Sequence, residues 1–374
     1  MKTQFEIAIV GGGLAGLVNA IDLSQRGHSV VLFEQNTFPK HKVCGEFVSN
    51  EIRPYLERLG AFPDEFNVAE IDRLEISDLS GKVIGTDLDL GGFGISRFAF
   101  DDHLARVAEK CGARILTNER VKSIAFDAGY HFLESRNGVK VRAKVVIGAF
   151  GKRSNLDRLM DRSFMQKRTS YVGVKCHYEA DFQENLVQLH NFEGGYCGLS
   201  RVETGAVNLC FLVDQKVLEQ YSGIEEMEQK HLAQNPHLKE FFEKSSPIFK
   251  SPLVISQVNF DSKPVVEDHV LMSGDAAGLI HPFCGNGMAM AIHSAQICSG
   301  MVHDFLSGKI SRSEMEGSYA KAWNKEFGAR LKFGRKASRL FGKPRLTGAA
   351  LGLMSTFPPL LNRASQMAHG KPIE

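Results

Sequence analysis

The first part of the chain alternates between apolar runs and one helical repeat. Residues 5–10 are apolar and rich in strand-forming types, and a helical spacing of apolar positions then continues to Arg26. A second apolar run, residues 29–33, ends at Glu34. This pattern predicts a strand, a glycine-containing turn, a helix and a second strand within the first 34 residues.

The middle of the chain has a different pattern. Apolar and polar positions alternate between about residues 171 and 259, for example over 187–192, and polar helical stretches interrupt them over 224–243. Such alternation is typical of an antiparallel sheet whose two faces differ. The first pattern then returns, with a buried strand at 270–272 and a long helix at 287–306.

We therefore predict an α/β protein of two domains followed by a helical tail. A Rossmann-like domain is assembled from segments that are far apart in the sequence, and an antiparallel-sheet domain is inserted between them. The predicted limits are 1–75, 95–165 and 260–310 for the Rossmann-like domain, 76–94 and 166–259 for the sheet domain, and 311–374 for the helical C-terminal region.

Composition narrows the class of protein. The 374 residues are 43% hydrophobic and 24% charged, which is typical of a folded globular chain. The net charge is only +2, from 45 basic and 43 acidic residues, so we do not expect a nucleic-acid partner. Seven scattered cysteines without a CxxC pair favour neither a metal site nor a disulfide framework. Because the sequence has neither a leader pattern nor an apolar run of membrane-spanning length, we expect a cytoplasmic protein.

The glycine turn has the spacing of a dinucleotide-binding loop. Gly11, Gly13 and Gly16 lie between the first strand and the first helix, and Glu34 closes the second strand. Glycines at this spacing allow a tight turn and a close approach of the backbone to a pyrophosphate, which the free N–H groups of the helix then face. Glu34 can accept hydrogen bonds from a ribose diol. We predict dinucleotide binding here, although this loop alone does not distinguish FAD from NAD.

A second motif, Ser273–Met288, resembles the Gly-Asp motif of FAD enzymes of the p-hydroxybenzoate hydroxylase and geranylgeranyl reductase type. The resemblance implies that Asp275 binds the ribityl chain of FAD and that the following loop opens a helix toward the flavin pyrimidine. A helix N-terminus stabilises the negative charge that reduced flavin carries near N1 and O2. The loop residues assigned to the cofactor are Pro282, Gly285, Asn286, Gly287 and Met288.

Other segments extend the resemblance over about residues 5–305. Arg97 is similar to the family's arginine near the phosphate and ribityl side of the flavin, and Val121 to the segment whose backbone meets the adenine. Lys42-Val43-Cys44-Gly45-Glu46 resembles the Cys-Gly segment beside the isoalloxazine in geranylgeranyl reductase-like enzymes, and we assign Lys42 to the cofactor. The resemblance implies a discontinuous Rossmann-like FAD domain and a sheet domain that covers the isoalloxazine.

Three departures from the family limit what it implies about the reaction. Phe150 stands where the hydroxylases usually carry an aspartate, in a motif linked to FAD and NAD(P)H use. Only Tyr196 remains of the reductases' Tyr-x-Trp-x-Phe-Pro motif, so a geranylgeranyl substrate does not follow directly. The Trp-x-Trp-x-x-Pro motif of flavin halogenases is absent, which disfavours halogenation. We expect the electrons to come from NAD(P)H or from a small redox protein.

Four residues are candidates for chemistry, each with a structural alternative. Cys44 is a candidate proton donor to a carbon opposite the hydride, or a small residue packed against the ring. Glu46 is a candidate acid, a partner of Arg97, or a structural carboxylate. In the predicted substrate pocket, His281 is a proton donor or a loop histidine satisfied by backbone. Tyr196 binds a substrate oxygen or packs in the sheet.

The C-terminal region is strongly basic. Residues 321–345 hold nine basic residues and one acid, and Trp323, Phe327 and Leu331 recur on one helical face. Residues 346–361 are apolar but broken by glycines and prolines. Such a segment contacts an anionic membrane surface or an acidic carrier protein, or it packs its apolar stripe on the body of the protein and leaves its charges in water.

These observations lead to one preferred function and two alternatives. We expect an FAD-dependent reductase or dehydrogenase that acts on C–C bonds of a lipophilic molecule of isoprenoid or polyketide type, by hydride transfer at flavin N5. The first alternative is a flavin monooxygenase that hydroxylates an aromatic or polyketide substrate. The second is a non-catalytic binding or escort protein with the same fold, which the intact glycine and Gly-Asp motifs disfavour.

Overall fold

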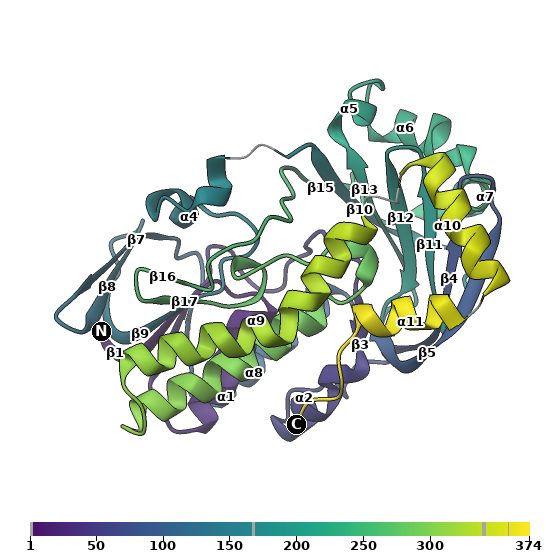
Figure 1. The fold of residues 1–374 in the computed structure, drawn as a ribbon. Coiled ribbons are helices and arrows are strands. Elements are labelled where there is room, and N and C mark those ends of the chain that lie inside the picture. Colours follow the sequence, from purple (N-terminus) through teal and green to yellow (C-terminus); the bar gives the residue numbers. More distant parts are fainter. Residues whose placement is uncertain (1–2, 167–168, 339–341, 358) are drawn as a thin grey trace.

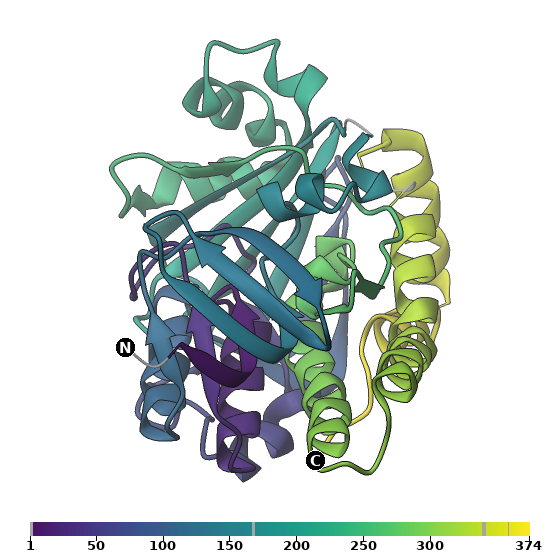
Figure 2. The same cartoon turned by 90° about the vertical axis from the view of Figure 1, so that its left-hand side faces the viewer.

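The computed structural model describes residues 3–166, 169–338, 342–357 and 359–374. Two β-sheets lie next to each other, and helices cover the outer side of each (Figures 1 and 2). The mixed α/β architecture, with a parallel sheet, a largely antiparallel sheet and C-terminal helices, confirms the predicted fold class.

The first sheet is of the parallel, Rossmann-like type. Its strands run in the order β16-β17-β9-β1-β2-β6, with the neighbours from β17 to β6 parallel, and a β7–β8 hairpin joins it through β9. The buried apolar runs of the sequence form its centre, as expected for a parallel sheet covered on both faces. Its strands are β1 (Gln4–Val10), β2 (Val30–Phe33), β6 (Arg114–Leu116), β7 (Val121–Asp127), β8 (Tyr130–Ser135), β9 (Lys140–Gly148), β16 (Val266–Glu267) and β17 (Val270–Met272).

Four long helices pack together beside this sheet. They are α1 (Leu14–Gln25), α3 (Arg97–Lys110), α8 (Gly287–Leu306) and α9 (Arg312–Ala337). Helix α1 contacts both α3 and α8, and α9 covers α8 (Figure 1). Trp323, Phe327 and Leu331 of α9 are buried in the same apolar core. The stripe predicted in the basic segment therefore packs on the body of the protein, and the alternative in which this stripe lies on a membrane is wrong.

The second sheet is antiparallel except for one parallel pair, β4 with β11. Its main order is β14-β10-β13-β12-β11-β4-β5-β3, with β15 beside β10. The pairing begins earlier in the chain than the predicted domain limits, because β3 and β4 join this sheet; the limits themselves stay a prediction. The strands are β3 (Phe47–Ser49), β4 (Ala69–Ser77), β5 (Val83–Gly94), β10 (Tyr171–Glu179), β11 (Leu186–Phe192), β12 (Gly195–Arg201), β13 (Val207–Asp214), β14 (Ser246–Pro247) and β15 (Leu253–Ile255).

Alternation along β10, β12 and β13 gives this sheet two different faces. One face, with Val174, Leu199 and Phe211, packs under three short helices, α5 (Gln215–Leu218), α6 (Ile224–Lys230) and α7 (Pro236–Lys244). The other face contacts residues of the first domain. Its contacting side chains are Tyr171, Lys175, His177, Tyr196, Ser200 and Asn208.

Four further helices complete the described part of the chain: α2 (Arg53–Arg58), α4 (Asn155–Leu159), α10 (Pro344–Thr356) and α11 (Pro359–Ala368). Helices α10 and α11 lie on the second sheet, where Leu351 and Leu361 pack against Ile76 and Ile84. Among the described helices, none has the length and apolar character needed to cross a membrane.

Candidate functional site

The glycine turn leaves no room for side chains. Gly11 has φ +111°, and a Cβ atom there would collide with the carbonyl oxygen of Ala149 on the neighbouring strand end. A Cβ atom at Gly16 would collide with the carbonyl oxygen of Gly11. The first glycine therefore allows the turn and the third allows α1 to pack against it, as the sequence predicted.

Glu34 lies directly against this turn. Its Oε2 accepts a hydrogen bond from the backbone nitrogen of Gly12 (2.8 Å), and its Oε1 accepts two from Asn36, from the backbone (2.9 Å) and the side chain (2.8 Å). The backbone of Glu119, two residues before Val121, donates to the carbonyl oxygen of Glu34 (2.9 Å). The structure thus brings the two segments assigned to the adenosine half of the cofactor together at one sheet edge.

Two cations lie near the N-terminal end of α1. A Cβ atom at Gly13 would be 3.6 Å from Nη2 of Arg97 and 4.0 Å from Nζ of Lys42. Both cations bind the buried Asp101, through a two-point contact from Arg97 (2.7 and 2.8 Å) and one from Lys42 (2.7 Å). Burial opposes ionisation of Asp101, but the two cations lower its pKa. Two positive groups beside a helix N-terminus form a site suited to a diphosphate.

Asp275 follows the end of β17, at the carboxyl edge of the first sheet. Burial raises the pKa of its carboxyl group, against the opposing charges of Lys263, Arg97 and Lys152. Lys263 donates to the backbone oxygens of Asp275 (2.8 Å) and Lys152 (2.7 Å), and burial lowers the pKa of Lys263 to about 8. Lys263 therefore holds the backbone of Lys152 and Asp275 in place. The carboxylate of Asp275 accepts no hydrogen bond from the described residues.

The loop that precedes α8 is held by its own backbone and by Glu51. Residues Pro282–Cys284 form one turn of 3₁₀ helix, and Gly285 has the left-handed φ of +64°. The buried Asn286 donates to Oε2 of Glu51 (3.3 Å), while its own Oδ1 has no partner among the described residues. An unpaired buried amide oxygen is costly, which suits a position where a ligand donor completes the bonding.

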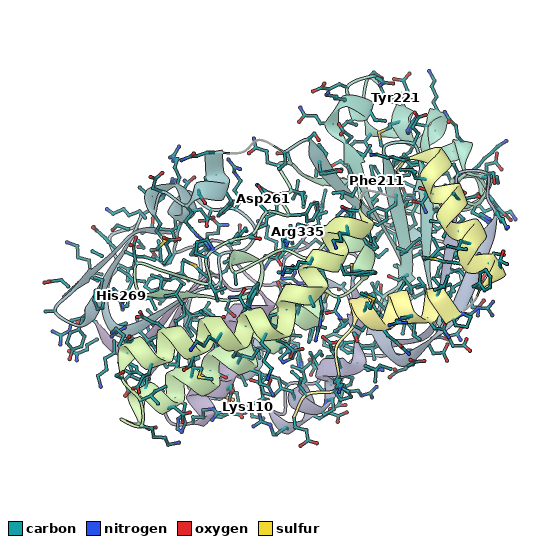
Figure 3. The ribbon with its side chains drawn as sticks, in the orientation of Figure 1. Lys110, Phe211, Tyr221, Asp261, His269 and Arg335 are labelled. Atoms are coloured by element: carbon teal, nitrogen blue, oxygen red, sulfur yellow. The ribbon has the colours of Figure 1, made fainter. Side chains whose placement is uncertain are left out.

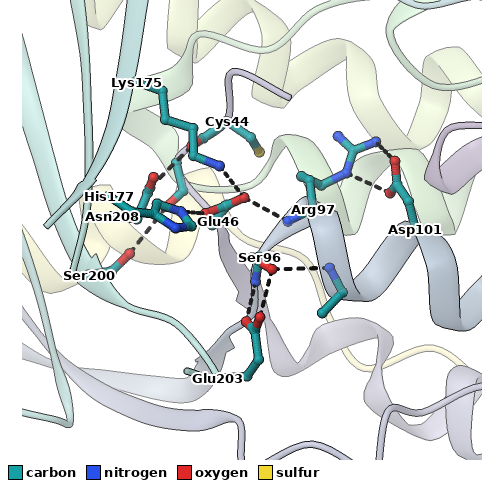
Figure 4. Close-up of polar contacts among 12 residues, drawn as sticks. Cys44, Glu46, Ser96, Arg97, Asp101, Lys175, His177, Ser200, Glu203 and Asn208 are labelled. Atoms are coloured by element: carbon teal, nitrogen blue, oxygen red, sulfur yellow. Dashed lines mark hydrogen bonds and ion pairs between the residues drawn. The ribbon is translucent and has the colours of Figure 1, made fainter. Parts of the chain in front are cut away.

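The Cys44–Glu46 segment leads into Phe47, which lies against this loop. A Cβ atom at Gly285 would lie 3.3 Å from the ring of Phe47. The backbone oxygens of Cys44 and Gly45 accept hydrogen bonds from Asn208 (3.1 Å) and Ser200 (3.2 Å) of the second sheet. The segment is thus fixed to the second sheet (Figure 4), and Phe47 places its end beside the predicted flavin loop.

Glu46 makes three polar contacts through its carboxylate in this position (Figure 4). Its carboxylate binds Nζ of Lys175 (2.5 Å) and Nε2 of His177 (2.7 Å) and accepts the backbone N–H of Arg97 (2.6 Å). Burial opposes its ionisation, but His177 and Lys175 together lower its pKa. The contacts therefore favour the charged, structural form of Glu46, and a role as proton donor stays a prediction without support from this geometry.

The surroundings of Cys44 favour the protonated form of its thiol, whereas those of Glu46 favour the ionised carboxylate. Burial raises the pKa of its thiol, Arg97 acts against this, and Glu46 adds to it. The sulfur atom points into the space between the Cys44 loop and Arg97 (Figure 4). A thiol with a raised pKa keeps its proton near neutral pH, as a proton donor requires.

Tyr196 and His281, predicted from separate motifs, meet in one aromatic cluster. Their ring centroids are 6.0 Å apart, and Phe260 and Phe283 lie 4.5 and 4.8 Å from His281. Burial lowers the pKa of His281 to about 3 and raises that of Tyr196. His281 is therefore neutral, and its role as a proton donor stays a prediction. Arg335 (Figure 3) donates to the carbonyl oxygen of Phe260 (3.4 Å) at the end of α9.

A cavity of about 560 Å³ is lined in part by His177, the residue that binds Glu46. The lining includes His41, Phe98, His177, Glu203 and Phe249. Among the described residues that line it there are two glutamates and neither lysine nor arginine, so it does not suit the diphosphate of a nicotinamide dinucleotide.

Four functional-site residues were missed from the sequence: Glu51, Lys175, His177 and Lys263. For Lys175 and His177 a signal existed, because two polar residues at i and i+2 of an otherwise apolar strand share one face. Nothing local marks Glu51 or Lys263, whose partners come from distant segments.

Comparisons with known proteins agree with this fold. Residues 9–45 match the model of an NAD(P)-binding Rossmann-like domain. The chain is 26% identical over 363 residues to the digeranylgeranylglycerophospholipid reductase 2 of Methanopyrus kandleri, which covers 91% of this chain and 87% of that protein. It is similar in structure to a geranylgeranyl bacteriochlorophyll reductase-like protein of Thermoplasma acidophilum, with a TM-score of 0.75, 21% identity and coverage of 97% and 92% of the two chains.

The fold is that of the FAD-dependent oxidoreductases. A flavin-dependent brominase has the same fold, with a TM-score of 0.80 at 17% identity over 98% of this chain and 93% of that one. The predicted resemblance to these flavoproteins and the predicted fold class are confirmed.

The residues of this chain fit FAD. The cations beside α1 suit its diphosphate, Glu34 lies at the adenosine end, and the carboxylate of Asp275 and the amide oxygen of Asn286 both lack donors that ribityl hydroxyls or ring N–H groups can supply. Individual contacts to FAD stay predictions, including those of Val121, Pro282, Gly287 and Met288.

Proposed function

We propose that this protein is an FAD-dependent reductase of carbon–carbon double bonds in a lipophilic, isoprenoid-type substrate. One observation supports this most directly: Phe47, which follows the Cys44–Glu46 segment, lies beside Gly285, and the Tyr196–His281 cluster contacts Phe283 of the same loop. The curated relative named above is a reductase of an isoprenoid lipid, which supports this substrate class.

The chain's own groups divide the work of the proposed reaction. When bound, FAD supplies the hydride. Arg97, Lys42 and the end of α1 hold the diphosphate, and Asp275 accepts hydrogen bonds from hydroxyls of the cofactor. The aromatic cluster excludes water from the substrate chain. Cys44 holds the proton that adds to the second carbon, so that each double bond gains one hydride and one proton.

The test is a single turnover of the purified protein loaded with FAD. The flavin is reduced anaerobically with dithionite, and a geranylgeranyl glycerolipid in detergent micelles is added. We expect flavin reoxidation and a product heavier by two hydrogen atoms for each reduced bond. A product that gains an oxygen atom when O2 is admitted would instead establish the monooxygenase alternative, and failure to retain FAD would establish the binding-protein alternative.

The electron donor is proposed at the level of two classes, NAD(P)H and a small redox protein. The lining of the cavity beside Glu46 offers no cation for a dinucleotide diphosphate among the described residues, which favours the redox protein. Reduction of the flavin by NADPH in the absence of other proteins would overturn this preference.

A lipophilic substrate would be presented to the protein by a membrane or by a carrier protein. A cytoplasmic protein in peripheral contact with a membrane, or with an acidic carrier protein, through residues 321–345 stays a prediction. Trp323, Phe327 and Leu331 are buried and do not contribute to such a contact.

A further inference from the structure

The two last helices carry a cluster of exposed apolar side chains. Of the eleven large hydrophobic residues that are exposed in the described part of the chain, five belong to α10, α11 or the turn between them. We name these five residues the apolar strip: Leu346, Leu353, Phe357, Leu360 and Met367.

Helix α10 is apolar on two faces, although it needs only one for packing. Leu351 faces inward and forms one cluster with Ile76 and Ile84 of the second sheet and with Leu361 of α11. Leu346 and Leu353 are two turns apart on a different face, and Phe357 continues that face one turn later. Leu353 is 54% exposed and Phe357 56% exposed. Burying Leu351 explains why α10 lies on the sheet, but it does not explain the second face.

The chain segment that carries the strip has charges of one sign, although Asp89 of β5 accepts a hydrogen bond from Gln366 of α11 (2.7 Å). Residues 327–373 contain nine lysines and arginines and no acidic residue. Arg363 lies between Leu360 and Met367 at helical spacing, on the same face of α11, and it is exposed, as are Lys332, Lys336, Lys343 and Lys371. Apolar side chains flanked by lysine and arginine, with no acid among them, are typical of segments that lie in the interface of an anionic bilayer.

The strip begins beside the proposed substrate pocket. The carbonyl oxygen of Gly342, two residues before α10, accepts a hydrogen bond from the backbone nitrogen of Gly194 (2.9 Å), next to Gly195 and Tyr196. On the preceding helix, a Cβ atom at Gly334 would be 3.5 Å from His281. Helices α10 and α11 lie on the outside of the second sheet in both views (Figures 1 and 2).

We propose that the apolar strip binds the surface of an anionic lipid bilayer and that the lipophilic substrate passes from there to the Tyr196–His281 cluster. The choice of substrate rests on the proposed function, whereas the binding of the bilayer rests only on the strip and its charges. Docking of an acidic carrier protein on the same face is the competing occupant.

The experiment measures flotation of the full-length protein with vesicles. Vesicles of phosphatidylcholine alone are compared with vesicles of equal parts phosphatidylcholine and phosphatidylglycerol, at low and at high salt. We expect binding to the anionic vesicles that weakens with salt and that falls about tenfold or more in the double variant Leu353→Gln/Phe357→Gln, because both side chains lose their insertion into the interface.

The matched control changes two equally exposed apolar residues on the other domain, Leu159→Gln and Phe132→Gln, which lie on α4 and β8. This control should bind vesicles like the unchanged protein. Equal flotation of the strip variant and the control would overturn the proposal. The proposal would also be overturned if the unchanged protein did not float with vesicles and instead bound an acidic acyl carrier protein through the strip.

Failure of this proposal is separable from failure of the proposed function. With substrate dispersed in detergent micelles, the strip variant should keep the turnover of the unchanged protein, and with substrate in anionic vesicles its turnover should fall with its binding. If both proteins float as expected but neither reduces the substrate in either form, the reductase assignment is wrong and the membrane surface stands.

Discussion

Nζ of Lys175 lies 2.5 Å from Oε1 of Glu46, and both side chains are fully buried. The two residues are 129 positions apart, one in the loop that borders the predicted flavin and the other in the second sheet. His177 binds the other carboxylate oxygen at 2.7 Å. This buried pair is therefore a charged connection between the two domains at the candidate site, beside the hydrogen bonds of Asn208 and Ser200 to the same loop.

Removing one partner of this pair should destabilise the protein. In Lys175→Met the carboxylate of Glu46 keeps His177 but loses its fixed cation inside the protein. We expect the free energy of unfolding, measured by urea denaturation, to fall by about 3–5 kcal/mol. The double variant Glu46→Gln/Lys175→Met should lose less than the single variant. Equal losses in both would show that packing rather than charge is responsible.

The same pair predicts a pH dependence of stability. The pKa of Glu46 is lowered in the folded state, so its ionised form adds stability above the ordinary glutamate pKa, and this contribution is lost as the pH falls through the lowered value. The difference in melting temperature between the unchanged protein and Glu46→Gln should therefore shrink in acid. A difference that stays constant down to the lowest pH at which the protein folds would contradict this assignment.

Cys44 should matter for turnover and not for cofactor binding. If its thiol donates the proton, Cys44→Ser should slow the single-turnover rate at least tenfold, which corresponds to about 1.4 kcal/mol of activation free energy. The affinity for FAD, measured by flavin fluorescence, should remain unchanged. Cys111→Ser is the matched control, because Cys111 lies at the end of α3 and is likewise partly exposed. An unchanged rate would remove Cys44 from the mechanism.

The sequence predicts most of the first domain because its signals are local. The glycine turn, the strand before it and the helix after it are neighbours in the chain, and Gly287–Leu306 was predicted as a helix with the observed limits. The contacts of Glu46 could not be predicted in this way. Its neighbours in the sequence allow an acid or a structural carboxylate equally, and only the fold brings Lys175 and His177 to it.

The placement of the C-terminal region also depends on contacts that local sequence does not reveal. A basic helix with an apolar stripe is expected both for a membrane-bound segment and for a helix packed on its own protein. Burial of Trp323 against Gly278 decides for packing, and that contact joins two segments about 45 residues apart. The exposed face of α10 was not recognised from the sequence, because Gly348 and Gly352 interrupt its apolar repeat and prolines follow it.

Glu51 connects the predicted flavin loop to α9 and to the last residues of the described chain. Its buried carboxylate binds Asn286 (3.3 Å), Arg330 (3.2 Å) and the backbone nitrogen of Gly370. Burial raises the pKa of Glu51, while Arg330 acts against this. In Arg330→Met the carboxyl group either keeps an uncompensated charge or takes up a proton, and in both cases its contact with Asn286 changes.

Arg330→Met should therefore weaken FAD binding although Arg330 itself does not border the cofactor loop. We expect the Kd for FAD to rise about tenfold, which corresponds to about 1.4 kcal/mol, in a titration followed by flavin fluorescence. Glu326→Gln is the control, because it removes the other, more exposed partner of Arg330 and leaves Glu51 in place. If both variants bind FAD like the unchanged protein, Asn286 does not depend on Glu51 for its position. If only Arg330→Met binds FAD more weakly, Arg330 of α9 positions the predicted flavin loop through Glu51.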